Sequence, residues 1–149
     1  EVKKAGGIYY TPAYIVDYIV KNTVGRLLEC HCEATEGGRG NLKSNNRKSK
    51  IVNRKSQTPK QVSNLRILDP ACGSGSFLLS AYTYLLNYHR DWYVENNPEK
   101  HRKKIYQGRG GQWFLTIAEK KQILLNNIFG VDIDSQAVEV TKLSLLLKV

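Results

Sequence analysis

One stretch in the middle of the chain combines an acid with two closely spaced glycines. It reads Asp69-Pro70-Ala71-Cys72-Gly73-Ser74-Gly75-Ser76. Apolar residues before the acid indicate a strand, and a helical pattern follows the glycines. Glycine lets the backbone turn sharply and approach a ligand closely, and a helix N-terminus offers unpaired N–H groups to an anion. Because open α/β sheets bind ligands at the carboxyl ends of their strands, the stretch predicts a binding site.

The charge of this turn favours one kind of ligand. A dinucleotide-binding turn needs a third glycine, and Leu78 stands at that position. The Asp69 carboxylate would also repel a pyrophosphate. S-adenosylmethionine instead carries an ammonium, a sulfonium and a single carboxylate. We therefore expect this turn to bind S-adenosylmethionine in preference to NAD.

A second acidic stretch, Gly130-Val131-Asp132-Ile133-Asp134, ends the next apolar segment. An acid at this place can accept hydrogen bonds from both ribose hydroxyls, so Asp132 is a candidate, and Ile133 can pack on the adenine face. Asp134 is expected to cap the following helix. Asp132 follows Asp69 by 63 residues, against roughly 20 in a compact unit. We therefore predict an insertion over residues 89–126, charged at first and helical at its end.

A third candidate lies near the start of the chain, in Gly7-Ile8-Tyr9-Tyr10-Thr11-Pro12. We expect Thr11 to cap a helix whose first residue is Pro12, since proline is favoured at that position. The Thr11 hydroxyl and the first N–H groups of the helix could then bind a carboxylate.

The remaining pattern indicates an α/β fold with a parallel sheet and flanking helices. We predict helices over residues 12–29, 77–88, 113–127 and 136–148, and strands over residues 65–69 and 128–132. Residues 33–64 contain eight Lys/Arg against two Glu and few apolar residues, so we expect a long basic insert. With a formal net charge of +10, the chain favours polyanionic partners; for the insert alone, a solvated linker is an equal alternative.

Other features exclude some classes of protein. Cys30 and Cys32 lack a second ligand pair at zinc-finger spacing, so we predict no metal site. No apolar stretch approaches the roughly 18 residues that span a bilayer, and no signal peptide is evident. We therefore expect a soluble cytoplasmic protein that does not associate with membranes.

The three motifs together resemble those of the amino-methyltransferases that act on exocyclic nitrogens of DNA bases. The D-P-A-C-G-S-G-x-F form of residues 69–77 is similar to the adenine-N6 enzymes of restriction-modification systems, especially the large single chains that fuse nuclease, methylase and recognition parts. The resemblance implies a Rossmann-like fold, S-adenosylmethionine as cofactor and double-stranded DNA as partner. The cofactor-binding residues that it implies are Tyr10, Thr11, Asp69, Pro70, Ala71, Cys72, Gly73, Gly75, Asp132 and Ile133.

The same family carries a catalytic Asn/Asp-Pro-Pro-Tyr/Phe loop, which holds the flipped adenine. This sequence has prolines at positions 12, 59, 70 and 98 and no Pro-Pro pair. We therefore expect residues 1–149 to be the truncated opening part of a methylase domain, without catalytic residues and inactive alone. Two other functions remain open: a non-catalytic nucleic-acid-binding module on a methyltransferase scaffold, and a methyltransferase that acts on RNA or protein.

Overall fold

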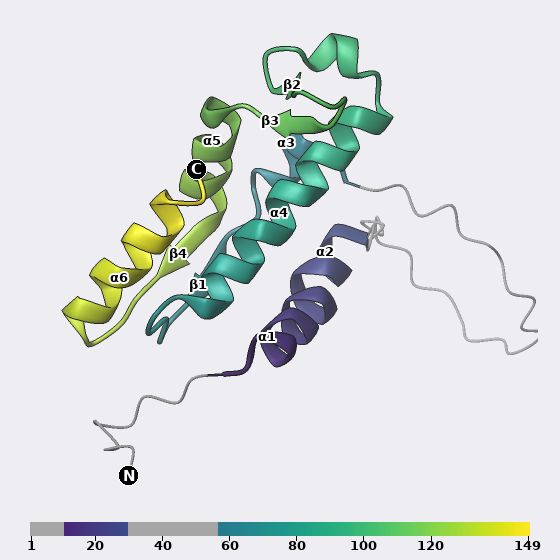
Figure 1. Cartoon of the computed structure of the whole chain (residues 1–149). Helices are drawn as coiled ribbons and strands as arrows, with labels where there is room; N and C mark the ends of the chain where they lie inside the picture. The colour runs from purple at the N-terminus through teal and green to yellow at the C-terminus, as the bar shows by residue number, and fades with distance from the viewer. Residues whose placement is uncertain (1–10, 30–56) are drawn as a thin grey trace, which may run out of the picture.

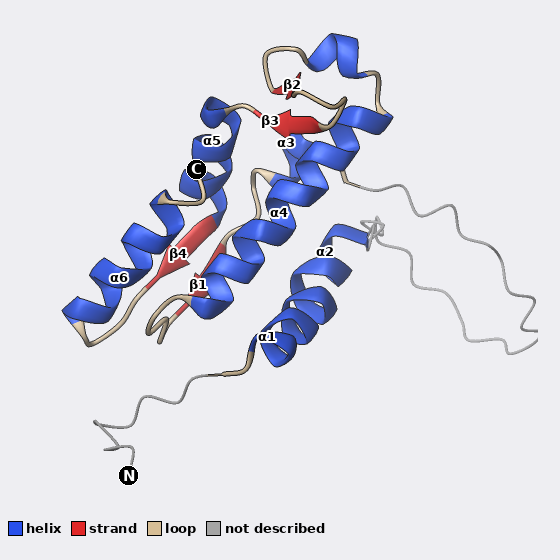
Figure 2. Ribbon diagram, in the orientation of Figure 1, coloured by secondary structure: helices blue, strands red, loops and turns tan. Residues whose placement is uncertain are grey.

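The computed structural model describes residues 11–29 and 57–149. A two-stranded parallel sheet lies among helices, and a separate antiparallel hairpin packs at one end (Figures 1 and 2). The predicted α/β class with a parallel sheet and flanking helices is confirmed. The helices are α1 (Ala13–Val20), α2 (Arg26–Glu29), α3 (Pro59–Val62), α4 (Ser76–Glu95), α5 (Ile117–Asn127) and α6 (Ser135–Leu146), and the strands are β1 (Ile67–Asp69), β2 (Ile105–Gln107), β3 (Trp113–Leu115) and β4 (Ile128–Gly130).

The first helical segment forms as predicted but begins one residue later. Pro12 is its N-cap, and the Pro12 carbonyl accepts the N–H groups of Ile15 and Val16, so the prediction of Thr11 as the cap is wrong. A π-helical turn over Lys21–Gly25 joins α1 to α2. The buried face repeats every four residues, as an amphipathic helix requires, through Val16, Val20, Val24 and Leu28.

The sheet pairs β1 with β4 in parallel, with Ile67 opposite Ile128 and Asp69 opposite Gly130. Each strand is shorter than the sequence predicts, but both lie inside the predicted ranges. Helix α4 packs against both strands, and α1 lies along α4 (Figure 1).

Helix α4 is longer than predicted, because its buried face continues past Tyr88. Leu78, Tyr82, Leu85, His89 and Tyr93 recur at three- and four-residue steps and are all nearly or fully buried. The Tyr82 hydroxyl donates to the Lys120 carbonyl on α5 (3.0 Å), and burial raises the pKa of Tyr82 to about 12. These contacts make α4 the centre of the core.

A hairpin replaces the start of the helix predicted over residues 113–127. β2 and β3 pair antiparallel, and α5 begins only at Ile117, with Thr116 as its N-cap. The prediction is therefore wrong for residues 113–116. The tip contains Gly110 at φ +98° and Gly111 at φ +82°, conformations that favour glycine and reverse the chain.

Part of the segment predicted as a long loop is folded. Thr58 and Gln61 form a capping box at the start of α3, and Val62 is fully buried. The Tyr88 hydroxyl donates to the Gln57 carbonyl (2.8 Å). The predicted loop over residues 33–64 is therefore wrong at its end, while Cys30, Cys32 and residues 33–56 lie outside the described residues.

The last predicted helix is confirmed as α6. The Asp134 carboxylate accepts the Gln136 N–H (2.9 Å), so Asp134 is the cap that the sequence predicts. Within residues 11–29 and 57–149, no helix is long and apolar enough to cross a membrane.

Candidate functional site

The two acidic motifs meet at the carboxyl ends of the parallel strands. The Val131 N–H donates to the Asp69 carbonyl (2.9 Å), and the Cys72 N–H donates to the Val131 carbonyl (3.0 Å). The glycine turn after β1 and the loop after β4 are thus hydrogen-bonded neighbours despite their separation in the sequence. This is the edge of the sheet at which α/β proteins bind ligands.

Asp132 holds the two loops together. Its Oδ2 accepts the Gly73 N–H (2.7 Å), and its Oδ1 accepts the Asp134 N–H (2.8 Å). The hydrogen bonds from the N–H groups of Asp134 and Gly73 lower the pKa of Asp132. The side chain is therefore an ionised carboxylate in a fixed orientation. Since a carboxylate offers about four acceptor positions, lone pairs remain on both oxygens for a ligand.

The two glycines of the turn differ in what surrounds them. Gly75 has φ +80°, and a Cβ at this position would lie 2.6 Å from Cγ2 of Thr141 on α6. Gly73 has φ +51°, and a Cβ there would meet no heavy atom within 4 Å. The Thr141 hydroxyl donates to the Gly73 carbonyl (2.8 Å) and fixes the turn. Gly75 is therefore required for packing, whereas Gly73 leaves open space beside Asp132.

Cys72 contributes packing at this turn. Its side chain is buried beneath β4, where a Cβ on Gly130 would lie 3.2 Å from the Cys72 Sγ. Burial raises the pKa of the Cys72 thiol, and the charges of Asp132 and Asp69 raise it further. The thiol is therefore protonated and turned away from solvent.

The other predicted residues of this edge face solvent or stabilise the turn. Oδ1 of Asp69 accepts the Ala71 N–H (3.1 Å), which is a local turn. Pro70 and Ala71 are exposed, and Ile133 is fully exposed. An apolar side chain left fully in water beside an ionised Asp132 is suited to pack on a ligand.

Helix α1 starts at the same end of the molecule as the glycine turn. Two contacts show that the first helical segment and α4 run in the same direction. Oδ1 of Asp17 on α1 accepts the Ser80 hydroxyl (2.7 Å). Farther along the segment, a Cβ on Gly25 in the π-helical turn would lie 2.8 Å from the Tyr84 hydroxyl. Asp69 and Pro70 line a cavity of about 260 Å³ together with residues of α1 and α4. Thr11 makes no hydrogen bond to the glycine turn in the described part of the chain, and Tyr10 lies outside it.

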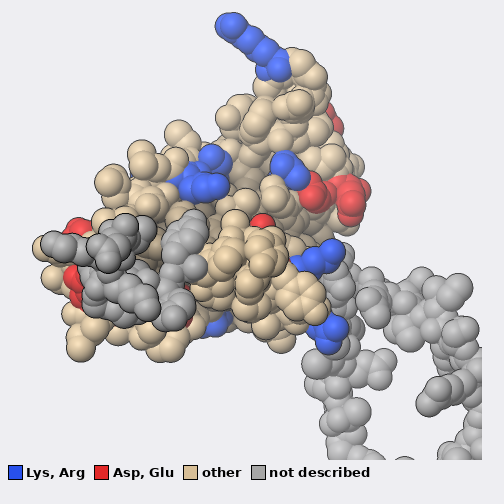
Figure 3. Space-filling model, turned by 60° about the horizontal axis from the view of Figure 1, so that its bottom comes forward, with Lys and Arg blue, Asp and Glu red and all other residues tan. Residues whose placement is uncertain are grey.

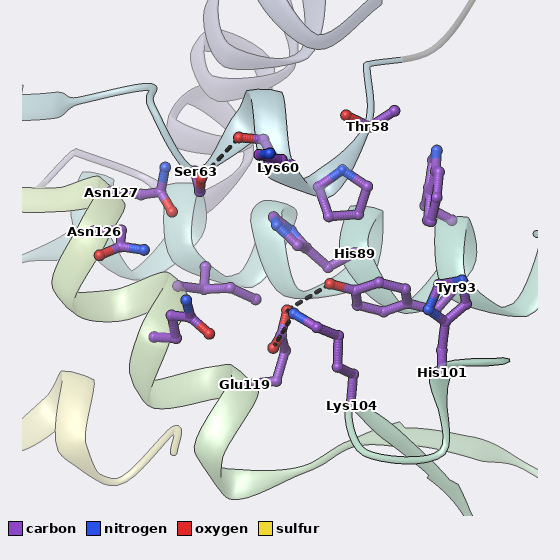
Figure 4. Close-up of a pocket in the computed structure, with 14 residues that line it drawn as sticks. Thr58, Lys60, Ser63, His89, Tyr93, His101, Lys104, Glu119, Asn126 and Asn127 are labelled. Carbon is purple, nitrogen blue, oxygen red and sulfur yellow. Dashed lines mark hydrogen bonds and ion pairs between the residues drawn. The ribbon is translucent and has the colours of Figure 1, made fainter.

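A second group of polar residues lies at the opposite end of α4, and the sequence did not reveal it. Figure 4 shows Glu119 of α5 pointing toward Tyr93 and Lys104, with His89 nearby. The Tyr93 hydroxyl donates to Oε1 of Glu119 (2.6 Å), and the Lys104 Nζ lies 2.9 Å from Oε2. Burial and this hydrogen bond raise the pKa of Tyr93. These side chains line a cavity of about 380 Å³ and connect α4, α5 and the hairpin.

Comparison with known proteins identifies the family. Residues 42–148 match the model of the MmeI DNA-methyltransferase domain. The chain belongs to this family. It is a methyltransferase domain of the restriction-modification type, as the motifs predict.

The relatives are much longer than this chain. RM.MjaORFECS2P of Methanocaldococcus jannaschii is 35% identical over 97% of this chain, which covers 12% of that protein. The adenine-specific methyltransferase BrxX of Escherichia coli is 30% identical over 93% of the chain, which covers 10% of it. The type II restriction enzyme and methyltransferase RM.Eco57I of Escherichia coli is 28% identical over 93% of the chain and is covered to 11%. The chain thus spans about a tenth of the length of these relatives.

Proposed function

We propose that this chain is the S-adenosylmethionine-binding part of a DNA adenine-N6 methyltransferase with a Rossmann-like fold. One observation carries the proposal: the ionised Asp132 carboxylate, held by N–H groups of both loops, lies beside the open space at Gly73. A neutral side chain, or a carboxylate without this fixed orientation, would bind two neighbouring hydroxyls less well than Asp132 does.

The residues at this edge suit the parts of the cofactor. Asp132 would accept hydrogen bonds from the ribose hydroxyls, and Ile133 would cover the adenine. The cofactor carboxylate would lie near the first turn of α4, whose N-cap Gly75 has no side chain to occupy the helix N–H groups. Asp69 would attract the ammonium. The bound cofactor would supply the methyl group.

The remaining predicted residues complete this assignment. Pro70, Ala71, Cys72, Gly73 and Gly75 would shape the turn through their backbone. Tyr10 and Thr11 would cover the methionine end of the cofactor, since α1 begins at this end of the molecule.

The substrate that we propose is adenine in duplex DNA, and the names of two relatives support the choice of adenine methylation in a restriction-type enzyme. BrxX is an adenine-specific methyltransferase, and RM.Eco57I is a restriction enzyme and methyltransferase. The motif Asp69–Phe77, which resembles the adenine-N6 enzymes, agrees with these relatives. The proposed reaction is transfer of the cofactor methyl group to the adenine amino group.

Titration calorimetry with S-adenosylhomocysteine, S-adenosylmethionine and NAD tests cofactor binding. We expect both S-adenosyl compounds to bind and NAD to bind more weakly. Gly73→Ala should lower the affinity for S-adenosylhomocysteine at least tenfold, the effect of about 1.4 kcal/mol, because the new methyl group enters the ligand space.

The matched control is Gly110→Ala, which also places alanine at a positive φ with no atom within 4 Å of its Cβ, but on the hairpin tip. It should leave the affinity within about twofold of the original. Tighter binding of NAD, or equal losses in the two variants, would contradict the proposed site.

A further inference from the structure

The β2–β3 hairpin exposes a pair of aromatic side chains on its outer face. Tyr106 and Phe114 are direct cross-strand partners, and their exposed fractions are 52% and 42%. Their rings stack with centroids 5.8 Å apart and an interplanar angle of 29°. The inner face is buried through Ile105 and Leu115. The outer pair therefore adds nothing to the core and forms a flat apolar surface in water.

Basic residues outnumber acidic ones in and beside this hairpin, with five Lys/Arg against two Glu over residues 99–119. Residues 100–118 contain five Lys/Arg and no Asp or Glu. Arg102 pairs with the exposed Glu99, and Lys104 pairs with Glu119. Lys100, Lys103 and Arg109 form no salt bridge within the described residues. Figure 3 shows a basic side chain projecting from the upper end of the molecule and a group of acidic side chains below it on the right.

The hairpin is held rigidly on the domain. The Thr116 N–H donates to the Lys104 carbonyl (2.8 Å), and the Gly108 N–H donates to the Gln112 carbonyl (2.8 Å). At its base, the Lys104 Nζ lies within 3.1 Å of both carboxylate oxygens of the buried Glu119. A ligand would therefore meet a preformed ribbon and would not need to order it.

We propose that this hairpin is a docking surface for duplex DNA, in which Lys103 and Arg109 bind phosphates and the Tyr106–Phe114 face lies in the major groove. A two-stranded ribbon fits a groove about 12 Å wide, and an apolar ring can contact thymine methyl groups there. Basic side chains without an acidic partner in the described residues, such as Lys103 and Arg109, complement phosphates through counterion release. The inference rests on the proposed function in taking DNA as the partner.

The position of the hairpin specifies which part of the DNA it would contact. It packs at the C-terminal end of α4, whereas the glycine turn lies at the N-terminal end. A helix of 20 residues is about 30 Å long, close to one turn of B-DNA. The hairpin would therefore bind DNA flanking the target base and increase affinity without touching the methylated adenine.

Fluorescence anisotropy with a mixed-sequence duplex at several salt concentrations tests the charge contribution. In the 149-residue chain, the double variant Lys103→Gln/Arg109→Gln should bind more weakly and lose about 2 from the slope of log K against log[salt], about 1 for each phosphate contact. The control, Lys121→Gln/Lys142→Gln, makes the same change in net charge at exposed positions on α5 and α6. It should change the slope by less than about 0.5. Equal slopes in the two double variants would overturn the inference.

The aromatic pair is tested separately with Tyr106→Ser/Phe114→Ser. This variant should bind duplex DNA roughly tenfold more weakly with an unchanged salt slope, because no phosphate contact is removed. Unchanged affinity would overturn the inference, as would preferential binding of single strands. A changed oligomeric mass without any effect on DNA affinity would assign the face to a protein contact and overturn it too.

Binding of S-adenosylhomocysteine distinguishes failure of this inference from failure of the proposed function. All hairpin variants should retain the original affinity for that ligand, which also shows that they are folded. If the original chain binds S-adenosylhomocysteine but the hairpin variants bind DNA normally, the docking surface is wrong and the cofactor site stands. If the original chain does not bind S-adenosylhomocysteine, the proposed function is wrong. The DNA affinities and salt slopes of the hairpin variants then decide alone whether the hairpin binds DNA.

Discussion

The contact between Gly75 and Thr141 makes the glycine turn sensitive to a single methyl group. Gly75→Ala places a Cβ 2.6 Å from Cγ2 and 2.8 Å from Oγ1 of Thr141, closer than a methyl group can approach. Overpacking of this kind costs about 1–3 kcal/mol. Alanine in the left-handed conformation at φ +80° costs about 1–2 kcal/mol more. The expected loss is therefore about 2–5 kcal/mol, a large part of the roughly 5–15 kcal/mol of a typical domain.

A double-mutant cycle separates the steric part from the backbone part. Thr141→Ala removes the two closest atoms, leaves its own Cβ 3.1 Å from the new methyl group, and loses the hydrogen bond to the Gly73 carbonyl, at a cost of about 1 kcal/mol. In Gly75→Ala/Thr141→Ala the new methyl group no longer meets these atoms, so the double variant should be about 1–3 kcal/mol more stable than additivity predicts.

The measurement is the free energy of unfolding in urea for the four proteins, with Gly73→Ala as a reference. Gly73→Ala shares the backbone cost at φ +51° but meets no heavy atom within 4 Å. It should be destabilised by about 1–2 kcal/mol only. Strict additivity in the cycle, or equal losses for Gly73→Ala and Gly75→Ala, would refute the reasoning.

Two further predictions concern the loop after β4 and the polar cavity. Asp134→Ala should cost about 1 kcal/mol of unfolding free energy with little change in cofactor affinity, because it removes a helix cap. Asp132→Asn should instead lower the affinity for S-adenosylhomocysteine about ten- to a hundredfold in calorimetry, because one charged acceptor becomes a donor. A loss of affinity in Asp134→Ala and a loss of stability alone in Asp132→Asn would refute the assignment of the two acids. Burial lowers the pKa of His89 in the folded state below the roughly 6.5 of the unfolded chain. The unfolded chain therefore binds a proton first as the pH drops below about 6.5, and the free energy of unfolding should fall by up to about 1.4 kcal/mol per pH unit. Urea unfolding should show a flatter pH dependence in His89→Gln than in the original chain, and identical profiles in the two would exclude this cause.

The sequence predicted the elements whose pattern is local. The buried repeat of the first helix, both strands of the parallel sheet and the Asp134 cap are found where the sequence placed them. The acids after the two strands were also predicted to lie at the ligand-binding edge. That Asp132 joins the two loops could not be predicted, because the hydrogen bond to Gly73 depends on the register of β1 and β4.

Three threonines explain the errors in helix starts. Thr58 and Thr116 begin helices, and each is followed three residues later by a side chain suited to a capping box, Gln61 or Glu119. Thr11 has Tyr14 at the equivalent position and is not a cap. The sequence signal was therefore present for α3 and α5 and was missed.

The polar cavity had no comparable signal. Tyr93 and Glu119 come from two helices and Lys104 from the turn before β2, and nothing in their spacing brings them together. The short apolar segment Trp113–Leu115 also suits a helix or a strand equally well. Only the packing of the hairpin against α4 decides between them.

The long connection between β1 and β4 affects how the domain acquires its structure. Strand pairing across residues 70–127 would close a loop of nearly sixty residues, an entropic cost that slows non-local contacts. The α4–hairpin–α5 unit is joined by contacts of shorter range, including the Tyr82–Lys120 and Tyr93–Glu119 hydrogen bonds. Once this unit has formed, the ends of the two strands are already close together, and the remaining entropy cost of pairing is small. The strands and the Asp132 bridge would then form last, so the edge at which we propose cofactor binding would be complete only in the final step of folding.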